Sequence, residues 1–447
     1  MSKSNSFHKI FAANQFKNIL KKDPKYRLAL LIGKLRNVSQ WHTVPAELMR
    51  VLRLTKWPLS KKDWQHYCNN KALEISIKRL HPSSVFQAAS SIAQHNGWDI
   101  AYEFSASLAP ECVNSLNIIR ANKFLSNDDM WLTCLNNYLE YFNQQPVKLS
   151  QSSGSKFSRL ESVDREEISS QALISVIMPA FNSAESVTHA ANSILRQSWK
   201  NLELIIIDDC STDDTWQKVK KLAQLDKRVK IFRNKINVGP YVSKNIALQI
   251  ARGDYVTGQD ADDWSHPDRL NICMQYLLYR QHEVKAIICN MLRVDTKDEF
   301  CRFDKLSIVN DGVSRSSAIS LFVEMKYFKE NLGYWDSVRF GADGELIQRA
   351  QLLLGEKLQY LDAISMIGLD HANSLTNHPE HGVDNLKGKS SIRQMYFKHY
   401  NQWHKESKQF IVPLQFPPTK RHFEAPQSML ISLEDIQANL HALKEAN

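Results

Sequence analysis

The 447-residue sequence predicts an α/β domain with a mostly parallel sheet, preceded by an all-helical part. From Leu173 onward, short β-branched runs alternate with helical patterns, which is typical of βαβ units. Before residue 145, apolar residues recur at helical spacing. Residues 146–172 are rich in Ser and charge and poor in apolar side chains, which predicts a linker between the two parts.

The positive charge of the chain belongs to its N-terminal segment. The whole sequence has a net charge of +10, with 57 Lys and Arg against 47 Asp and Glu. Residues 1–79 carry 17 basic and 4 acidic residues, whereas residues 151–447 carry 37 of each. Basic amphipathic helices bind anionic membrane surfaces, but the same pattern also fits the solvated rim of a helical core. Both interpretations stay open.

The rest of the helical part divides at helix-breaking residues. Four helices are expected, with a break at Asn96 and Gly97 and a stop at Pro110. Together with the basic segment they form a predicted N-terminal domain over residues 1–145. The expected helices are 85–94, 98–108, 112–124 and 128–142.

The α/β part begins at residue 173, and a C-terminal extension follows over residues 377–447. The extension has two helical stretches, 391–403 and 432–443, around a proline-punctuated segment. It could line an acceptor groove, face a membrane, or pack back onto the α/β domain. The expected strands of the α/β part are 174–178, 204–207, 229–232 and 255–257, and the helices between them are 185–197, 213–225 and 241–251.

Polar residues follow three of the expected strands, over 179–182, 208–211 and 260–263. In open α/β sheets, ligands bind beyond the carboxyl ends of the strands. Neighbouring carboxylates repel one another unless a cation lies between them, and oxygen ligands suit a divalent metal. Such a metal can in turn bridge a diphosphate. The pattern therefore indicates a metal-assisted site at this edge of the sheet.

Three sequence blocks carry a family resemblance: PAFNSAESV, SILRQSWKNLELIIIDDCSTDDT and NVGPYVSKNIALQIARGDYVTGQDADDWSHPDRL. In this order and spacing, over about residues 173–270, they resemble the nucleotide-sugar-binding half of an inverting glycosyltransferase of family 2. The more divergent block GYWDSVRFGADGELIQR, at 333–349, resembles the acceptor-side segment of that family. The resemblance implies a GT-A fold, which is Rossmann-like, over residues 173–376.

The resemblance also implies donor and metal contacts. Asp209, supported by Asp208, would bind the nucleotide base, and Lys244 would approach the base or the diphosphate where the family often has Arg. Asp262, with Asp260, would hold Mn²⁺ or Mg²⁺, and His371 resembles a histidine that contacts metal or diphosphate in some relatives, although a structural role is also open. The implied donor-binding residues are Pro179, Ala180, Phe181, Glu185, Asp208, Asp209, Lys244, Asp260 and Ala261.

For the acceptor side, the resemblance implies Asp343 as the general base. Inversion needs one carboxylate to take the proton of the attacking hydroxyl group. Ala342 replaces a Glu that many relatives have, and Asp336 and Glu345 remain rival bases. Tyr334, Trp335 and Asp336 are candidate acceptor contacts, since aromatic rings stack on the apolar faces of sugars, although packing is an equally open role for the aromatics.

The sequence as a whole predicts a metal-dependent inverting glycosyltransferase that moves a sugar from a nucleotide sugar, most simply a UDP-sugar, to a glycan or glycolipid in bacterial surface-polysaccharide synthesis. A catalytically inactive scaffold that recruits partners through its helices is the alternative, and a nucleotidyltransferase is a third possibility. Scattered cysteines and the lack of a membrane-spanning run predict a cytoplasmic protein, peripheral on the membrane if the basic segment binds it. No motif predicts nucleic-acid binding.

Overall fold

The computed structural model describes residues 82–446 except 165, 281–282, 304–310, 373, 379, 385–387 and 408–411. The basic segment 1–79 lies outside the described residues, so its membrane interpretation stays a prediction. The chain divides into two compact units, one made of Met1–Tyr138 with Glu299–Arg315, the other of Leu139–Asp298 with Ser316–Asn447. In the described part, no helix is both long and apolar enough to span a bilayer.

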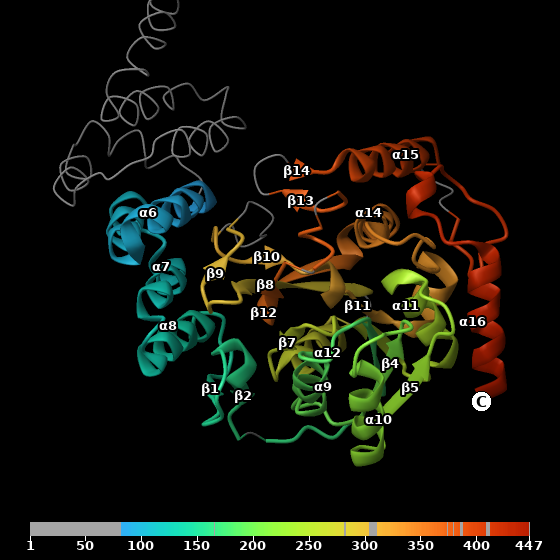
Figure 1. The fold of residues 1–447 in the computed structure, drawn as a ribbon, viewed down its shortest axis with the longest axis horizontal. Coiled ribbons are helices and arrows are strands. Elements are labelled where there is room, and N and C mark those ends of the chain that lie inside the picture. The colour runs from blue at the N-terminus through green and yellow to red at the C-terminus, as the bar shows by residue number, and fades with distance from the viewer. Residues whose placement is uncertain are drawn as a thin grey trace, which may run out of the picture. The chain divides into compact units, whose positions relative to one another are not determined.

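The first unit is helical (Figure 1), with α6 (Pro82–Leu108), α7 (Val113–Ala121), the 3₁₀ turn η2 (Asn122–Phe124) and α8 (Asp128–Glu140). The break expected at Asn96 and Gly97 is confirmed, because α6 holds two helical stretches that meet at a kink at Gly97, where φ is +81° and the backbone is not helical. Residues 299–303 return to this unit: Phe300 stacks on Trp131 at 5.1 Å between ring centroids. Asn122 fixes the return through hydrogen bonds to both backbone groups of Phe300, 2.7 and 2.9 Å long.

The second unit is built on a mostly parallel sheet, which confirms the predicted fold class. β3 is parallel to β4 and β6, β4 to β5, and β12 to β8, whereas β11 and β7 run antiparallel to their neighbours. The strand order is β5 (Val229–Arg233), β4 (Leu202–Asp208), β3 (Ile174–Ala180), β6 (Tyr255–Gly258), β11 (Phe322–Glu324), β8 (Ala286–Asp295), β12 (Leu358–Asp370) and β7 (Asp263–Ser265).

Helices cover both faces of this sheet, as Figure 1 shows. Successive side chains of a strand point to opposite faces, so a strand that is buried on both sides is apolar throughout. In β4, Ile205 packs in one hydrophobic cluster with residues of α11, whereas Ile206 packs in another with residues of α9, α10 and α12. The four helices are α9 (Val187–Leu195), α10 (Thr215–Leu225), α11 (Gly239–Ile250) and α12 (Arg269–Tyr279).

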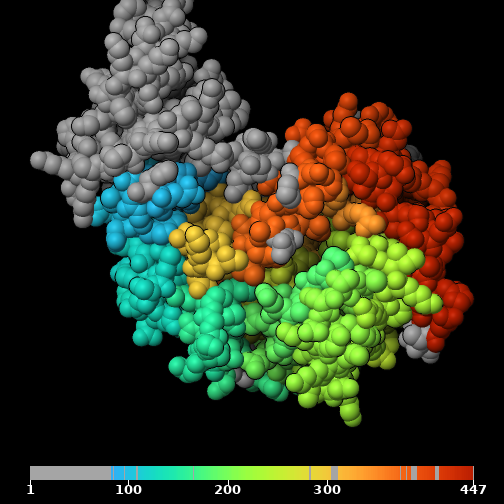
Figure 2. All heavy atoms as spheres, in the orientation of Figure 1, coloured from blue at the N-terminus to red at the C-terminus, as the bar shows by residue number. Residues whose placement is uncertain are grey.

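The C-terminal extension packs into the core of the second unit. Tyr396 and Tyr400 of α15 and Ile436 of α16 belong to the same cluster as Ile205. In Figure 2 the C-terminal residues, in red, lie directly against orange and yellow-green residues of that unit. Of the roles considered for the extension, packing onto the α/β domain is therefore confirmed. The helices concerned are α14 (Ala342–Leu354), α15 (Ser391–Ser407) and α16 (Leu433–Ala446).

The Ser-rich segment 146–172 contains hydrogen-bonded structure. β1 (Val147–Leu149) and β2 (Leu160–Ser162) pair as an antiparallel hairpin, with the 3₁₀ turn η3 (Phe157–Arg159) between them. The Asp298 carboxylate accepts hydrogen bonds from the backbone of Lys156 and Phe157 at 2.8 and 3.0 Å. The remaining short elements are β9 (Phe300–Cys301), β10 (Arg315–Ser316), η4 (Ala318–Ser320), α13 (Met325–Tyr327), the π-helical η5 (Phe328–Leu332), η6 (Gly355–Lys357), β13 (Val383–Asp384), β14 (Gly388–Lys389) and η7 (Gln427–Met429).

A buried ion pair on α14 fixes the chain at residues 332–334. The guanidinium of Arg349 donates to both carboxylate oxygens of Glu345, at 3.0 and 2.7 Å, and both side chains are fully buried. It also donates to the carbonyl oxygens of Leu332 and Tyr334. His404 of α15 lies 3.1 Å from Glu345. This network ties α14, α15 and the segment before Trp335 together.

Replacing Arg349 by Met should destabilise the second unit by about 3–5 kcal/mol, because Glu345 would keep a buried charge without its main partner. Urea unfolding followed by fluorescence measures the loss. Arg280→Met is the control, since the exposed side chain of Arg280 pairs with Glu283 at the surface and its loss should cost at most about 0.5 kcal/mol. Equal unfolding midpoints for the two variants would contradict this role of Arg349.

Candidate active site

The loops that follow β3 and β4 are joined by side-chain hydrogen bonds. The backbone of Asn182 donates to Ser211 Oγ at 3.0 Å, and Asn182 Oδ1 accepts from the backbone of Thr212 at 2.9 Å. Asn182 and Cys210 adopt left-handed backbone conformations, with φ of +46° and +64°. The joined loops leave the Phe181 side chain 48% exposed at the carboxyl edge of the sheet. Glu185, on the same loop, is also exposed.

Asp209 holds the N-terminus of α11. Its Oδ1 accepts hydrogen bonds from Asn234 Nδ2 (2.7 Å) and Val238 N (3.0 Å), and its Oδ2 accepts from Gly239 N (2.7 Å). Burial raises the pKa of Asp209, and these hydrogen bonds oppose that rise. Asp208 lies beside it at the end of β4, with its Oδ2 3.0 Å from Arg233 Nε. Both carboxylates thus have partners within the protein.

The helix fixed by Asp209 presents Tyr241, Lys244 and Asn245 toward the segment predicted to bind the acceptor. Asn245 binds the backbone of Trp335 in both directions, donating to its carbonyl oxygen at 2.9 Å and accepting from its N–H at 3.0 Å. The Lys244 ammonium is buried and lies 5.0 Å from the centre of the Tyr241 ring and 5.5 Å from that of Trp335. Helix α11 therefore positions the predicted acceptor segment.

Asp343 receives hydrogen bonds from three of these groups. Trp335 Nε1 and Lys244 Nζ donate to its Oδ1 at 2.9 and 3.2 Å, and Tyr241 Oη donates to its Oδ2 at 3.1 Å. Asp343 lies in the first turn of α14, where the helix dipole stabilises negative charge. Three donors on two oxygens fix the orientation of this carboxylate.

The two rival carboxylates are less accessible than Asp343. The side chain of Asp343 is 28% exposed, against 9% for Asp336 and 0% for Glu345. Asp336 accepts hydrogen bonds from Tyr396 Oη (2.9 Å) and Arg421 Nη2 (2.5 Å), and Glu345 pairs with Arg349. A general base must reach the hydroxyl group that it deprotonates, so the geometry favours Asp343.

Carboxylates crowd together after β6. Burial, together with the charges of Asp262 and Asp343, raises the pKa of Asp260 to about 6, against the opposing charge of Lys244. His371 Nε2 lies 2.8 Å from Asp262 Oδ2, and this hydrogen bond raises the pKa of His371. Within the described residues, no three His, Cys, Asp or Glu side chains are arranged to hold a metal ion as they stand. Asp260 and Asp262 nevertheless offer the hard oxygen ligands that Mn²⁺ and Mg²⁺ prefer, and a cation would relieve their repulsion.

The other predicted contacts vary in accessibility. Pro179 and Ala180 are buried in β3, and Ala261 is buried beside the carboxylates. Tyr334 Oη accepts a hydrogen bond from Gln249 at 3.0 Å. Trp335 is nearly buried and lies against Asp343 rather than standing free as a stacking platform.

Sequence reasoning missed three side chains of this site. Tyr241 precedes Lys244 by three residues, so its place on the same helical face could have been anticipated. Arg393 of α15 lies near enough to Asp343 and Tyr241 that their charges oppose the lowering of its pKa by burial. It donates to the carbonyl oxygens of Leu375 and His381, and so fixes the segment that follows His371. No local pattern indicates this role for Arg393.

Arg269, the third missed residue, supports the strand that leads to Asp260. It is fully buried, and its guanidinium donates to Thr257 Oγ1 at 2.8 Å, Gly258 O at 2.5 Å and Gln259 Oε1 at 2.8 Å. These bonds hold the end of β6 and the start of the acidic loop. The signal in the sequence is an Arg at the beginning of a helix that otherwise buries apolar residues.

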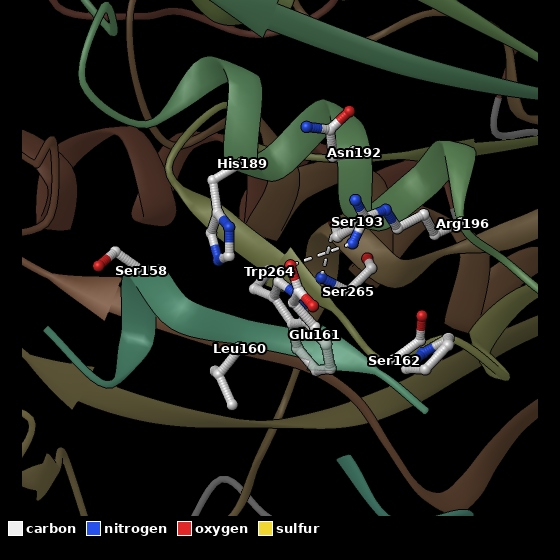
Figure 3. A pocket seen from close by; sticks show the side chains of 11 residues that line it. Ser158, Leu160, Glu161, Ser162, His189, Asn192, Ser193, Arg196, Trp264 and Ser265 are labelled. Atoms are coloured by element: carbon white, nitrogen blue, oxygen red, sulfur yellow. Dashed lines mark hydrogen bonds and ion pairs between the residues drawn. The ribbon is translucent and has the colours of Figure 1, made fainter. Parts of the chain in front are cut away.

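A hollow of about 420 Å³ lies elsewhere on the second unit, between β2, α9 and β7 (Figure 3). Figure 3 shows Arg196 and Glu161 side by side at its rim, where their closest atoms are 3.3 Å apart. None of the residues predicted for the donor, metal or base lines it. Burial lowers the pKa of its His189 to about 4, so this side chain is neutral at pH 7. We assign the hollow no part in the site around Asp343.

Known proteins match the part of the chain that contains this site. Residues 175–343 match the family model described as glycosyl transferase family 2. An uncharacterized glycosyltransferase of Haemophilus influenzae is 42% identical over 24% of this chain and 42% of its own length. The putative colanic acid biosynthesis glycosyl transferase WcaA of Escherichia coli is 28% identical over 53% of this chain and 85% of its own.

The name of a further relative specifies its sugar donor. The Escherichia coli UDP-Glc:alpha-D-GlcNAc-diphosphoundecaprenol beta-1,3-glucosyltransferase WfaP is 39% identical over 21% of this chain and 36% of its own length. Among solved structures, Staphylococcus aureus TarS has 23% identity and a TM-score of 0.38 over 44% of this chain and 60% of that one. The chain spans 42% and 34% of the length of two Haemophilus influenzae relatives.

Replacing Asp209 by Ala should destabilise the second unit by about 2–4 kcal/mol, because the buried N–H groups of Asn234, Val238 and Gly239 would lose their acceptor. The midpoint of urea unfolding measures the loss. Asp214→Ala is the control, since the exposed Asp214 side chain makes no capping hydrogen bond at the start of α10. A midpoint for Asp209→Ala within error of the control would show that Asp209 does not hold α11.

Proposed function

Because residues 175–343 match the family model described as glycosyl transferase family 2, we propose that this chain transfers a sugar from a nucleoside diphosphate sugar to a hydroxyl group of a glycan. One observation carries the proposal. An oriented and accessible carboxylate, Asp343, lies close enough to Asp260 that its charge helps to raise the pKa of Asp260, and Asp262 lies on the other side of Ala261 from Asp260 in the chain. A base on one side of the reacting carbon and a diphosphate site on the other are what an inverting transfer requires.

The donor is proposed to bind at the carboxyl ends of β3 and β4. The exposed Phe181 ring can stack on a nucleotide base, and the hydrogen-bonded loops beneath it would hold the ring in place. A UDP-sugar is proposed as the donor, because one relative, WfaP of Escherichia coli, is named as a transferase that uses UDP-Glc. Asp209 would act mainly through α11, since its carboxylate oxygens already accept hydrogen bonds from the backbone and from Asn234.

Asp260 and Asp262 would hold Mn²⁺ or Mg²⁺, with His371 as a further ligand if it leaves its hydrogen bond to Asp262. When bound, such an ion supplies positive charge that stabilises the departing diphosphate. The buried Lys244 ammonium, whose charge opposes the rise in the pKa of Asp260, adds positive charge from the protein itself. Arg393 would keep the segment after His371 in place through its bonds to Leu375 and His381.

Asp343 is proposed as the general base. Its carboxylate would accept the proton of the acceptor hydroxyl group as that oxygen attacks the anomeric carbon from the side opposite the diphosphate. Trp335, Tyr241 and Lys244 orient the carboxylate before the acceptor arrives. Such preorganisation reduces the rearrangement needed in the transition state.

The biological setting proposed is the synthesis of a bacterial surface polysaccharide at the inner face of the cell membrane. The relative named for colanic acid biosynthesis supports the product class. Attachment to the membrane through the basic residues 1–79 is part of this proposal and rests on the sequence alone.

Replacing Asp343 by Asn should lower sugar transfer by about 10²–10⁴-fold, because an amide cannot accept the hydroxyl proton. Transfer from UDP-[¹⁴C]glucose to a lipid-linked glycan acceptor measures the rate. Binding of UDP, followed by calorimetry, should stay unchanged. Asp362→Asn, at an exposed position of β12, is the control and should transfer normally. Wild-type rates in Asp343→Asn would assign the base to another residue.

Replacing Asp262 by Asn should remove the metal dependence of nucleotide binding. In the unmodified protein, UDP with Mn²⁺ should raise the thermal midpoint more than UDP with EDTA, since a ligand that binds only the folded state stabilises it. The difference should shrink to near zero in Asp262→Asn. A Mn²⁺ effect that survives this change, or that is absent from the unmodified protein, would contradict the metal site.

A further inference from the structure

A small, open pocket lies between the segment that follows Tyr334 and the C-terminal segment 414–423. Most of its wall comes from residues outside the 175–343 match, so the family alone does not define it. The lining residues are Trp335, Asp336, Ser337, Leu414, Gln415, Pro418, Lys420, Arg421, His422 and Phe423.

This pocket is next to the proposed base. Trp335, which lines it, donates from Nε1 to Asp343 Oδ1 at 2.9 Å. The backbone of Trp335 is fixed by Asn245, and the backbone of the preceding Tyr334 donates to Leu414 O at 2.9 Å. Trp335 therefore lies between the pocket and Asp343, the proposed general base.

The charge of the pocket is positive. Arg421 and Tyr396 both bind Asp336, so the negative charge of this carboxylate is already paired. Lys420 is exposed at the pocket, and among the described residues its ammonium forms no ion pair. Burial and the charge of Lys420 lower the pKa of His422, which is thus neutral at pH 7 and adds no charge. One positive charge remains, at Lys420.

The rest of the wall suits a sugar. Ser337 and Gln415 can exchange hydrogen bonds with hydroxyl groups, whereas the rings of Trp335 and Phe423 are buried against other side chains. A wall of polar and cationic groups fits a sugar that carries an acidic group better than it fits a neutral sugar or a purely apolar ligand.

We propose that this pocket binds an anionic sugar unit of the acceptor, with the acidic group at Lys420. The acid is the carboxylate of a uronate or the phosphate of a sugar phosphate, and both share the chemistry that the pocket recognises. The proposal rests on the proposed function in one respect, namely that the occupant is part of the acceptor.

Saturation-transfer NMR tests this with three probes: methyl α-glucuronoside, glucose 6-phosphate and neutral methyl α-glucoside. Saturating UDP and diamagnetic Mg²⁺ are present to fill the proposed donor site, because paramagnetic Mn²⁺ would broaden the signals of the probes. We expect one or both anionic probes to bind about fivefold more tightly than the glucoside, which corresponds to ~1 kcal/mol. The anionic probe that binds more tightly identifies the acid.

Variants locate the binding. Lys420→Gln should remove the preference for the anionic probe, Lys420→Arg should keep most of it, and Lys398→Gln, an exposed lysine of α15 that does not line the pocket, should leave it unchanged. Equal binding of charged and neutral probes, or an unchanged preference in Lys420→Gln, would overturn the proposal.

The readouts for the pocket and for the proposed function are independent. If UDP with Mn²⁺ fails to stabilise the protein and no sugar is transferred, the proposed function fails. In that case a preference for anionic probes that depends on Lys420 would still support the anionic sugar site. If the unmodified protein transfers sugar but shows no preference for anionic probes, the anionic sugar site alone is rejected.

Discussion

The hydrogen bonds that join Asp343 to Trp335, Lys244 and Tyr241 are the contact on which the rest of the site depends. They connect α11 to the segment 332–336 and to the first turn of α14, both of which lie far from α11 in the sequence. Asp209 fixes the start of α11 through the backbone of Val238 and Gly239. Asp209, which follows β4, therefore influences the proposed general base Asp343 through helix α11. A shift of α11 would move Asp343 and Trp335 together.

The site brings negative charges close to one another, which lowers the stability of the folded state. This cost in stability indicates that the charges serve a function. Partly buried carboxylates with a raised pKa, such as Asp260, oppose folding unless other groups offset their repulsion. Lys244 offsets part of it from within the protein, and a divalent cation would offset more. Groups with perturbed pKa values gather where ligands or reactions need them. By contrast, the charges of Glu345 and Arg349 neutralise each other, and Arg349 holds the backbone of residues 332–334 in place.

Local pattern was sufficient for the first four strands of the α/β part and the helices between them, but β7, β8, β11 and β12 were not predicted from it. The apolar runs at 174–178 and 204–207 lie within β3 and β4, and the polar residues after them lie at one edge of the sheet, because parallel strands end on the same side. Local pattern could not predict the return of residues 299–303 to the helical unit, or the role of Arg393. Both depend on contacts between residues far apart in the chain. The hairpin at 147–162 was also missed, because its strands are short and Asp298 supports it from more than a hundred residues away.

We propose that the space bounded by Asp343, Asp260 and Asp262 holds the reacting sugar. A crystal structure with a non-hydrolysable UDP-sugar analogue and Mn²⁺ tests this most directly. We expect the nucleotide base to stack on Phe181, the diphosphate to lie at Asp260 and Asp262, and the anomeric carbon to lie between the diphosphate and Asp343. A nucleotide bound elsewhere, for example in the hollow beside His189, or a sugar that faces away from Asp343, would contradict it.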